Sequence, residues 1–422
     1  MPSRENVRAV RTQLKRLKSL VEASRILNST LNLEELLALI LEVATRNLGA
    51  SRGTIYLVDP EKKELWSKVL HGDRQVEIRL PFGQGVAGYV AETGKTVNVI
   101  DAYNDERFFS GVDQKSGFRT KTMLGMPMRN KDDDIIGVFQ IINKRRGIFT
   151  KEDELFLIAL SIHASLAIEN ARLLQSALEK ERMQKELQIA RTIQRKLLPE
   201  QLPAITGIDV SAINLPSREV GGDLYDIIQL DDHRIAFIIA DVAGKSVPAA
   251  LLVSTLHASL HASISSIDSL PQLCQRLNDI IFKDSLAECY ITCFICIVDL
   301  RERQLISVNA GHNVCFLLRG SNLLRLEEGG LPFGMFEHAD YAQQCTTFQT
   351  GDLMILYTDG VVEAMNKNRQ LYSEERFLGQ LMENLTRTPK EIESAVYDDV
   401  RKFIGVMEPS DDFTLMVARF TK

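Results

Sequence analysis

One long predicted helix divides the chain. The helical pattern begins at Lys151 and meets no breaker before Leu198, after which Pro199 ends it because proline lacks a backbone N–H and clashes with the preceding turn. The segment is apolar on every side as far as Ile168 and then becomes strongly charged. We interpret the charged part as a connector between two domains, and a merely solvated spacer helix is the alternative.

The apolar positions of this connector do not keep one register. Leu166 and Leu173 fit one heptad pattern, and a second set fits another, namely Met183, Ala190, Ile193 and Leu197. Such a coiled-coil-like helix with a shifting register is typical of signalling connectors. Residues 4–22 also carry apolar side chains at three-four spacing, which fits either a short dimeric coiled coil or an amphipathic helix on the next domain. We predict a homodimer.

Bulk properties limit the class of protein. The 422 residues suffice for two or three domains of ~100–200 residues each, and 45% hydrophobic with 25% charged residues is typical of soluble globular proteins. The net charge of −6 favours neither nucleic acid nor an anionic membrane as a partner. We find no signal peptide and no apolar run approaching the ~18 residues that span a bilayer, so the prediction is cytoplasmic.

The cysteines fit a reducing compartment, because all six lie beyond residue 270 and form no framework for the whole chain. Cys293 and Cys296 lie three residues apart in an apolar, strand-like run, where their side chains face opposite sides. We therefore predict two small buried hydrophobic residues and not a zinc or redox pair.

Residues between the N-terminus and the long helix indicate an α+β sheet domain. A helix is predicted from Asn32, with Glu35 placed to complete its N-terminal cap. The period then changes to that of strands, and five are predicted: Thr54–Val58, Leu65–Leu70, Val76–Leu80, Met123–Met128 and Ile135–Asn143.

This region resembles a GAF domain over nearly all of residues 25–170. The resemblance rests on Gly83-Gln-Gly-Val-Ala-Gly, Asp101-Ala-Tyr-Asn-Asp-Glu-Arg-Phe, Leu124-Gly-Met-Pro-Met and Ile136-Gly-Val. A further motif resembles that of GAF domains in cyclic-nucleotide phosphodiesterases and cyclases, and consists of Asn143, Lys144, Phe149, Asp153 and Glu154. The resemblance implies a cAMP or cGMP pocket in which this motif mainly supports the fold.

Two alternatives stay open for the motif and its domain. Thr150 and Asp153 can form an N-cap pair for the helix from Lys151, which alone would explain the acidic residues. The domain could also serve dimerisation or bind another small molecule, because a shared fold does not fix the ligand.

The second half of the chain places acidic residues at strand ends. Asp223 and Asp241 lie at opposite ends of a predicted hairpin, Asp359 follows an apolar strand, and Asp411 and Asp412 precede another. Any one aspartate at a strand end is most often a turn residue. Four acidic sites of this kind are a rarer pattern, and carboxylates without His or Cys companions favour Mg²⁺ or Mn²⁺ over zinc.

Alternating strands and helices predict a layered β-sandwich covered by helices. The predicted strands are Leu224–Leu230, Arg234–Ala240, Tyr290–Asp299, Gln304–Asn309, Val314–Arg319, Asp352–Thr358 and Phe413–Phe420, and the predicted helices are Leu270–Phe282, Glu374–Glu383 and Pro389–Ile404, with another after Ser246.

Residues 190–422 resemble the PPM-type serine/threonine phosphatases, and more closely their SpoIIE/RsbU branch, which have an αββα sandwich. The motifs are Gln194-Arg-Lys-Leu-Leu-Pro, Arg218-Glu-Val-Gly-Gly-Asp-Leu-Tyr-Asp, Ala240-Asp-Val-Ala-Gly-Lys-Ser-Val-Pro-Ala-Ala-Leu, Asn309-Ala-Gly-His, Leu331-Pro-Phe-Gly, Leu356-Tyr-Thr-Asp-Gly-Val-Val-Glu-Ala and Asp411-Asp-Phe-Thr-Leu.

The resemblance implies two Mg²⁺ or Mn²⁺ ions that activate a water for attack on a phosphoryl group, so that no side-chain nucleophile is needed. It implies Asp241 as the ligand that bridges both ions and the Val242 carbonyl as a ligand of the first. It further implies Asp359 and Asp411 as ligands of the second ion, with Asp223 acting near it through water. Asp223 and Asp241 are thus the candidate catalytic residues.

Three further residues belong to these motifs. Asp412 is expected to orient the site. Arg218, five residues before the first aspartate, could contact the phosphate, and a solvent-facing or structural arginine is equally compatible with the sequence. His312 could act as a general acid, but Asn309-Ala-Gly-His is read better as a turn.

The sequence therefore predicts four parts: an N-terminal helix (1–24), a GAF sensor domain (25–170), a helical connector (171–200) and a PPM-type phosphatase domain (201–422). The predicted function is dephosphorylation of phosphoserine or phosphothreonine on a regulatory protein, such as an anti-sigma-factor antagonist, under control of a small molecule at the GAF domain. The alternative is a non-catalytic, ligand-gated interaction protein with a phosphatase-like fold.

Overall fold

The computed structural model describes residues 32–71, 74–111, 113, 118–199, 201–218, 220–244, 247–266, 269–286 and 289–422, together with Leu14 and Lys18. The chain divides into two compact units, Met1–Arg182 and Met183–Lys422. The helix predicted over residues 1–24 lies outside the described residues, apart from Leu14 and Lys18.

The first unit is built on a six-stranded antiparallel sheet in the order β3-β2-β1-β6-β5-β4. Its elements are α2 (Leu33–Leu48), β1 (Ala50–Asp59), β2 (Glu64–His71), β3 (Arg74–Pro81), α3 (Gly85–Thr93), β4 (Val97–Val99), the 3₁₀ turn η1 (Ala102–Asn104), β5 (Met123–Arg129), β6 (Ile135–Lys144) and α5 (Lys151–Arg195). The five predicted strands are present, and β4 is an addition because three residues are too few to show a period.

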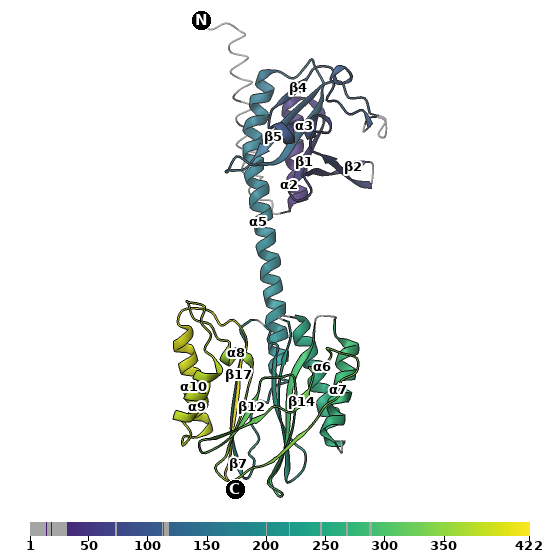
Figure 1. Ribbon diagram of the computed structural model, residues 1–422. Coiled ribbons are helices and arrows are strands. Elements are labelled where there is room, and N and C mark those ends of the chain that lie inside the picture. The colour runs from purple at the N-terminus through teal and green to yellow at the C-terminus, as the bar shows by residue number, and fades with distance from the viewer. Residues whose placement is uncertain are drawn as a thin grey trace. The chain divides into compact units, whose positions relative to one another are not determined.

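Helices cover both faces of this sheet (Figure 1). One core joins α2 and the first half of α5 to one face, with Ile40 of α2 and Leu160 of α5 fully buried. A second, smaller core joins α3 to the other face through Val86 and Val90. Asn32 caps α2 as predicted, because its side chain accepts hydrogen bonds from the backbone N–H groups of Glu34 and Glu35.

The long helix α5 ends at Arg195, about one turn before the predicted end at Leu198. Its buried residues stop at Ala171, and beyond that point its apolar side chains, such as Leu173, are exposed. The change follows the sequence, which turns from apolar to charged after Ile168.

Among the described residues, two helical segments are long and apolar enough to cross a membrane by length and composition alone, Lys151–Arg195 and Val247–Ser266. The expectation that no segment approaches that length was therefore wrong. It considered unbroken apolar runs, whereas these helices interrupt their apolar residues with polar ones, and Val247–Ser266 contains Ser, Thr and His but no Asp, Glu, Lys or Arg. Of the most apolar window in each helix, 50% and 33% are buried inside the protein, so core packing uses part of this apolar surface.

The second unit is a sandwich of two sheets, ordered β14-β11-β10-β9-β8, with β15 also paired to β11, and β13-β12-β16-β17-β7. Its strands are β7 (Ile208–Leu215), β8 (Asp223–Gln229), β9 (Arg234–Val242), β10 (Ile291–Asp299), β11 (Gln304–Ala310), β12 (Cys315–Arg319), β13 (Asn322–Leu326), β14 (Gly329–Gly330), β15 (Gln344–Thr347), β16 (Leu353–Tyr357) and β17 (Phe413–Phe420). Its helices are α6 (Val247–Ser263), the 3₁₀ turn η2 (Ile264–Ser266), α7 (Leu270–Asp284), α8 (Asp359–Val362), α9 (Glu374–Glu383) and α10 (Pro389–Ile404).

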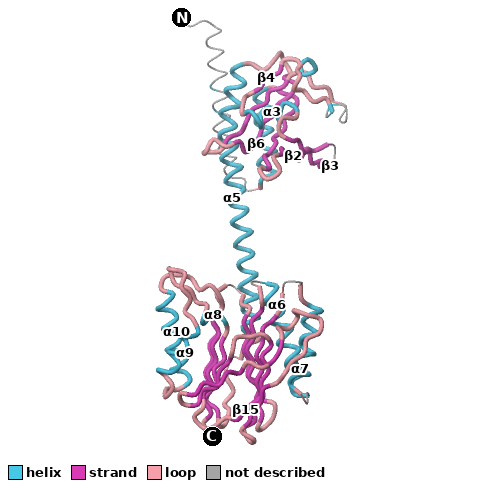
Figure 2. The backbone as a smooth tube through the Cα atoms, in the orientation of Figure 1, coloured by secondary structure: helices cyan, strands magenta, loops and turns pink. Residues whose placement is uncertain are grey.

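Three cores hold the four layers together. The inner faces of the two sheets meet in one core, where Phe237 and Phe294 of the first sheet pack with Met416 of the second. Helices α6 and α7 cover the outer face of the first sheet, and α9 and α10 cover the outer face of the second (Figures 1 and 2). The predicted αββα sandwich is therefore confirmed.

The cysteines of this unit are all free thiols. Cys293 and Cys296 lie on β10 and are fully buried, the first in the core under α6 and α7 and the second in the core between the sheets. They face opposite sides of the sheet, as predicted. Cys345 on β15 is exposed.

Candidate active site

The two aspartates of the predicted hairpin lie opposite each other. Asp223 opens β8 and Asp241 lies near the end of β9, and the register of this antiparallel pair makes them direct partners. Asp223 shares its strand face with Tyr225, which belongs to the core between the sheets. Both carboxylates therefore belong to one end of the sandwich.

The other two predicted ligands come from the second sheet. Asp359 follows β16 and begins the short helix α8, while Asp411 lies two residues before β17. Helix α8 lies against β17 (Figure 1), and the approach is very close: a Cβ at Gly360 would lie only 1.9 Å from the Asp412 carbonyl oxygen. A glycine is required there because any side chain would separate the two segments.

The raised pKa values of Asp223 and Asp241 reflect the closeness of these carboxylates. Burial, and then the neighbouring carboxylates of Asp359 and Asp411, raise the pKa of Asp241 to about 7. Burial and the carboxylates of Asp241 and Asp412 raise the pKa of Asp223 well above its usual range. The repulsion comes from the very residues predicted to share two cations, and an all-oxygen cluster of this kind suits Mg²⁺ or Mn²⁺.

Two threonines that the sequence reasoning missed hold Asp223 in place. The Thr358 hydroxyl donates a hydrogen bond of 2.7 Å to Asp223 Oδ2, and the Thr414 hydroxyl donates to the same oxygen. Both bonds lower the pKa of Asp223 and so oppose part of the rise. Their positions in the sequence could have suggested this role, because each lies near a predicted acidic site. Thr358 directly precedes Asp359, and Thr414 lies two residues after Asp412.

Asp412 organises the loop that leads into β8. Its Oδ1 accepts hydrogen bonds from the backbone N–H and the hydroxyl of Ser217, and its Oδ2 accepts one of 2.7 Å from the backbone N–H of Gly222. Gly222 in turn packs against the other strand, where a Cβ would lie 3.2 Å from the Val242 carbonyl oxygen and 3.3 Å from Asp241 Oδ1. The loop thereby brings its backbone against both Asp241 and Val242.

The end of the long helix contacts the same loop. Gln194, in the last turn of α5, donates a hydrogen bond of 2.7 Å to the Gly221 carbonyl and accepts one of 3.0 Å from the Gly221 N–H. Gly221 lies two residues before Asp223. Gln194 opens a motif that the sequence reasoning noted, but no role was assigned to its amide.

His312 and Arg218 lie differently from the aspartates. Both ring nitrogens of His312 face protein groups, namely the Thr292 hydroxyl and the Tyr357 carbonyl, and burial lowers the pKa of His312 to about 4. The backbone N–H of His312 donates a hydrogen bond to Asn309 Oδ1, which is consistent with the predicted turn. Arg218 is exposed.

In the first unit, the predicted nucleotide motif forms a connected network. Lys144 makes an ion pair with the fully buried Asp153, which also accepts bonds from the backbone and hydroxyl of Thr150. Asn98 of β4 donates to the Phe149 carbonyl and to Glu154 Oε1, each at 3.0 Å. The motif thus joins β6, β4 and the start of α5.

Asn143, the remaining residue of that motif, has a positive φ of 55°. Its side chain accepts a hydrogen bond of 2.6 Å from the Lys121 N–H and donates one of 2.8 Å to the Arg119 carbonyl. It therefore fastens the segment before β5 to the end of β6.

Comparison with known proteins finds a different family in each half of the chain. The model of the GAF domain matches residues 32–168, and that of SpoIIE (Stage II sporulation protein E) matches residues 231–421. The SiaA-PP2C domain of Pseudomonas aeruginosa shares the fold of the second unit, with a TM-score of 0.53, 22% identity, and 58% of this chain and 99% of that chain covered. The fold and the acidic cluster define a PP2C-like, PPM-type phosphatase domain.

One relative shows to which family of these phosphatases the chain belongs. Phosphoserine phosphatase RsbU of Bacillus subtilis (strain 168) is 30% identical over 274 residues, which are 63% of this chain and 78% of that protein. The chain therefore belongs to the SpoIIE/RsbU family of serine/threonine protein phosphatases and carries a GAF domain before its phosphatase domain.

The first unit has relatives of another kind. The dual 3',5'-cyclic-AMP and -GMP phosphodiesterase 11A of Takifugu rubripes is 38% identical over 166 residues, 36% of this chain. The chain spans only 18% of that protein's length, so the likeness is to one part of it.

Proposed function

We propose that this protein is a metal-dependent phosphatase that hydrolyses phosphoserine or phosphothreonine on a regulatory protein. The observation that carries the proposal is the convergence of Asp223, Asp241, Asp359 and Asp411 at one end of the sandwich, where carboxylates raise one another's pKa. Such an accumulation of negative charge is stabilised when cations bind it.

Each side chain then has a task. Asp241 would bridge two ions, the Val242 carbonyl would complete the first, and Asp359 and Asp411 would hold the second. Asp223, fixed by two threonine hydroxyls, would orient a water there. When bound, two divalent cations supply an activated water and neutralise phosphoryl oxygens during in-line attack.

Hydrolysis of a phosphoserine peptide and of p-nitrophenyl phosphate by the full chain with Mn²⁺ tests this proposal. We expect turnover by the wild type, and turnover at background for Asp241→Asn. Asp232→Asn is the matched control, because Asp232 is exposed in the β8–β9 turn of the same hairpin. Equal activity of Asp241→Asn and the wild type, or none in either, would sink the proposal and favour a non-catalytic interaction protein.

The partner we propose is a small phosphorylated regulator of the anti-sigma-factor antagonist type. The support is the likeness to a phosphoserine phosphatase, RsbU, over most of that relative's length. Release of inorganic phosphate from such a purified phosphoprotein is the test. Hydrolysis of peptides but of no phosphorylated antagonist would exclude this partner class.

For the GAF domain we propose a cyclic nucleotide, cAMP or cGMP, as the small-molecule ligand. The support is the likeness to the phosphodiesterase, together with the motif from Asn143 to Glu154. Since Lys144 pairs with Asp153 and Glu154 accepts a hydrogen bond from Asn98 of β4, the proposed role of the motif is to support the pocket and not to contact the nucleotide. Titration calorimetry of the full chain with each nucleotide decides the matter, and no heat from either removes the proposal.

Regulation would pass through α5 in a homodimer. Exposed leucines and isoleucines lie along the helix. In its last turn, Gln194 is hydrogen-bonded to the loop before Asp223. The proposed domain limits are 25–170 for the sensor, 171–200 for the connector and 201–422 for the phosphatase.

We place the protein in the cytoplasm, a location that suits its six free thiols. Cell fractionation is the test. Recovery in the membrane pellet would contradict this location and would turn attention to the two long apolar helices.

A further inference from the structure

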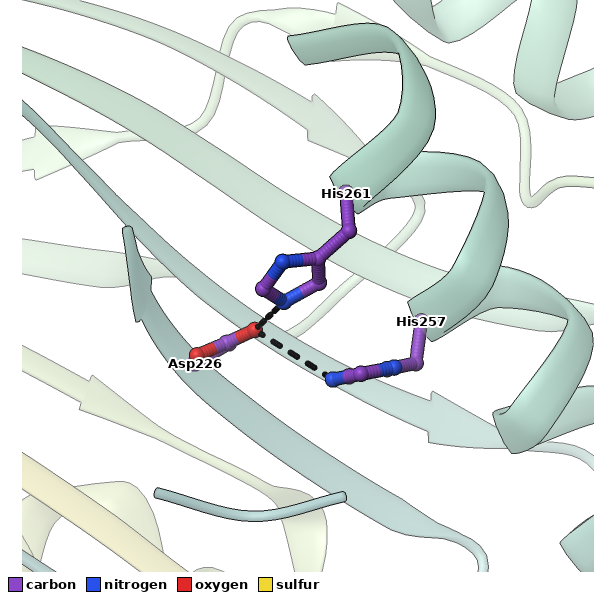
Figure 3. Close-up of side chains that lie close together, drawn as sticks. All are labelled: Asp226, His257 and His261. Carbon is purple, nitrogen blue, oxygen red and sulfur yellow. Dashed lines mark hydrogen bonds and ion pairs between the residues drawn. The ribbon is translucent and has the colours of Figure 1, made fainter. Parts of the chain in front are cut away.

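A second cluster of metal-ligating side chains lies on the other face of β8. Asp226 follows Asp223 by three residues, so the two side chains point to opposite faces of the strand. Asp226 therefore faces α6, where His257 and His261 are four residues apart and share one side of the helix. Figure 3 shows the three side chains converging from the strand and the helix.

The distances bring three ligand atoms together. Asp226 Oδ2 lies 2.6 Å from His261 Nε2 and 3.8 Å from His257 Nε2, and one ligand atom from each residue lies within 4.8 Å of the others. The other oxygen, Oδ1, accepts a hydrogen bond of 2.8 Å from the Ile227 N–H, which fixes the carboxylate. Hydrogen bonds that orient a ligating side chain in this way are typical of metal sites.

The ligand types identify the class of ion. Two imidazoles and one carboxylate suit zinc and related transition-metal ions, unlike the all-oxygen set around Asp241. Zinc ligands at ~2.0–2.1 Å in a tetrahedron lie roughly 3.3 Å apart. The Asp226–His261 pair would need to open by less than an ångström, and the His257–Asp226 pair to close by about as much.

Exposure leaves room for entry and for a fourth ligand. The side chain of Asp226 is 7% exposed, that of His257 22% and that of His261 45%. The site is thus buried at the strand and open at the last turns of α6. Three protein ligands with one open position is the arrangement in which zinc keeps a water.

We propose that Asp226, His257 and His261 bind one Zn²⁺ ion, separate from the two ions of the phosphatase centre, and that this ion fastens α6 to β8. The competing explanation is that His261 merely satisfies a buried carboxylate by a hydrogen bond. The two explanations differ at His257, because its ring nitrogen lies 3.8 Å from Asp226, too far for a hydrogen bond.

Zinc binding by the full chain with Asp241→Asn is the test, since that background lacks the proposed bridging ligand of the phosphatase centre. After treatment with a chelator, the protein is titrated with Zn²⁺ against a chromophoric competitor, and Co²⁺ is then substituted. We expect one bound ion and the intense visible spectrum of four-coordinate, nitrogen-ligated Co²⁺. Six-coordinate Co²⁺ on oxygen ligands absorbs weakly and would mark the other centre.

Variants of the ligands locate the ion. His257→Gln keeps the His261–Asp226 hydrogen bond, so the fold is retained, and we expect zinc affinity to fall at least roughly 10- to 100-fold, the loss known for outer-sphere partners alone. His261→Asn should abolish the intense Co²⁺ spectrum. His233→Asn, at an exposed histidine in the β8–β9 turn, is the matched control and should bind as the parent does.

Two results would overturn the proposal: no tight zinc in the Asp241→Asn parent, or equal zinc affinity in the parent and in His257→Gln. Circular dichroism checks that each variant is folded. Because binding is measured without phosphatase turnover, failure of this proposal leaves the proposed function untouched, and an inactive phosphatase would leave the zinc result standing.

Discussion

At the scale of single residues, Asp223 is subject to two opposing effects, repulsion from neighbouring carboxylates and stabilisation by hydrogen bonds. Its carboxylate is buried beside two other acids, and two threonine hydroxyls are directed at one oxygen. The hydroxyls favour the ionised form, which is the form that serves a cation site.

Thr414→Val should therefore weaken metal activation. The change keeps the shape of the side chain but removes a hydrogen bond to a charged group, worth about 1.5–3 kcal/mol, so roughly 10- to 100-fold more Mn²⁺ should be needed for half-maximal activity. The measurement is phosphatase rate against Mn²⁺ concentration. Thr347→Val, at an exposed position of β15, should leave the curve unmoved, and an unmoved curve for Thr414→Val would refute the role.

His312 predicts how the stability of the protein depends on pH. Its folded pKa of about 4 lies below the ordinary 6.5, so the folded state favours the neutral ring. The stabilisation is complete above pH 6.5 and is lost as pH falls toward 4, by up to about 3 kcal/mol. Urea unfolding between pH 7.5 and 4 should show His312→Gln less stable at pH 7.5 but flatter toward acid. An equally steep acid limb would contradict this.

At the scale of elements, the junction between β6 and α5 depends on one buried ion pair. Asp153 is 0% exposed and Lys144 16%, and Thr150 adds two bonds to the same carboxylate oxygen. Removing one partner leaves the other charge unpaired in a poorly solvated place.

Asp153→Ala should therefore destabilise the first unit by about 3–5 kcal/mol. Scanning calorimetry of the full chain should show one transition lowered and that of the phosphatase unit unchanged. Asp132→Ala, in the exposed β5–β6 turn, is the control. If both variants melt like the wild type, the ion pair does not support the junction.

The sequence predicted most of the longer strands and helices and missed others, among them the eight-residue strand β7 and the nine-residue helix α3. Strands such as β8, β9 and β17 show apolar runs bounded by turns, whereas β14 is two glycines and β4 only three residues. The acidic positions were predicted because they lie at strand ends. The threonines were not, because Thr358 meets Asp223 across 135 residues of chain, and only the folded sandwich brings them together.

The histidine pair was missed for a related reason. The spacing of His257 and His261 was visible in the sequence, but the third proposed ligand is Asp226, 31 residues before the first histidine, on the strand face away from the proposed catalytic aspartates. The sequence reasoning considered histidine only beside the acidic cluster. A four-residue histidine repeat on a predicted helix was the available signal.

At the scale of the whole molecule, assembly should depend on the exposed apolar side of α5. Leu173 is 64% exposed, and a charge there would stand in the proposed helix–helix contact. We expect the wild type to be a dimer by light scattering and Leu173→Glu to shift toward the monomer. Val406→Glu, at a residue 97% exposed outside α5, should not. A wild-type monomer, or an intact Leu173→Glu dimer, would exclude this interface.

The cysteines give the molecule a selective chemical handle. Burial raises the pKa of the Cys274, Cys293, Cys296 and Cys315 thiols, which therefore hold little reactive thiolate and are shielded from reagents. Cys345 alone of the six is exposed. A maleimide dye should accordingly attach first at β15, so that the native protein can carry a fluorescent reporter on its phosphatase domain without any engineered residue.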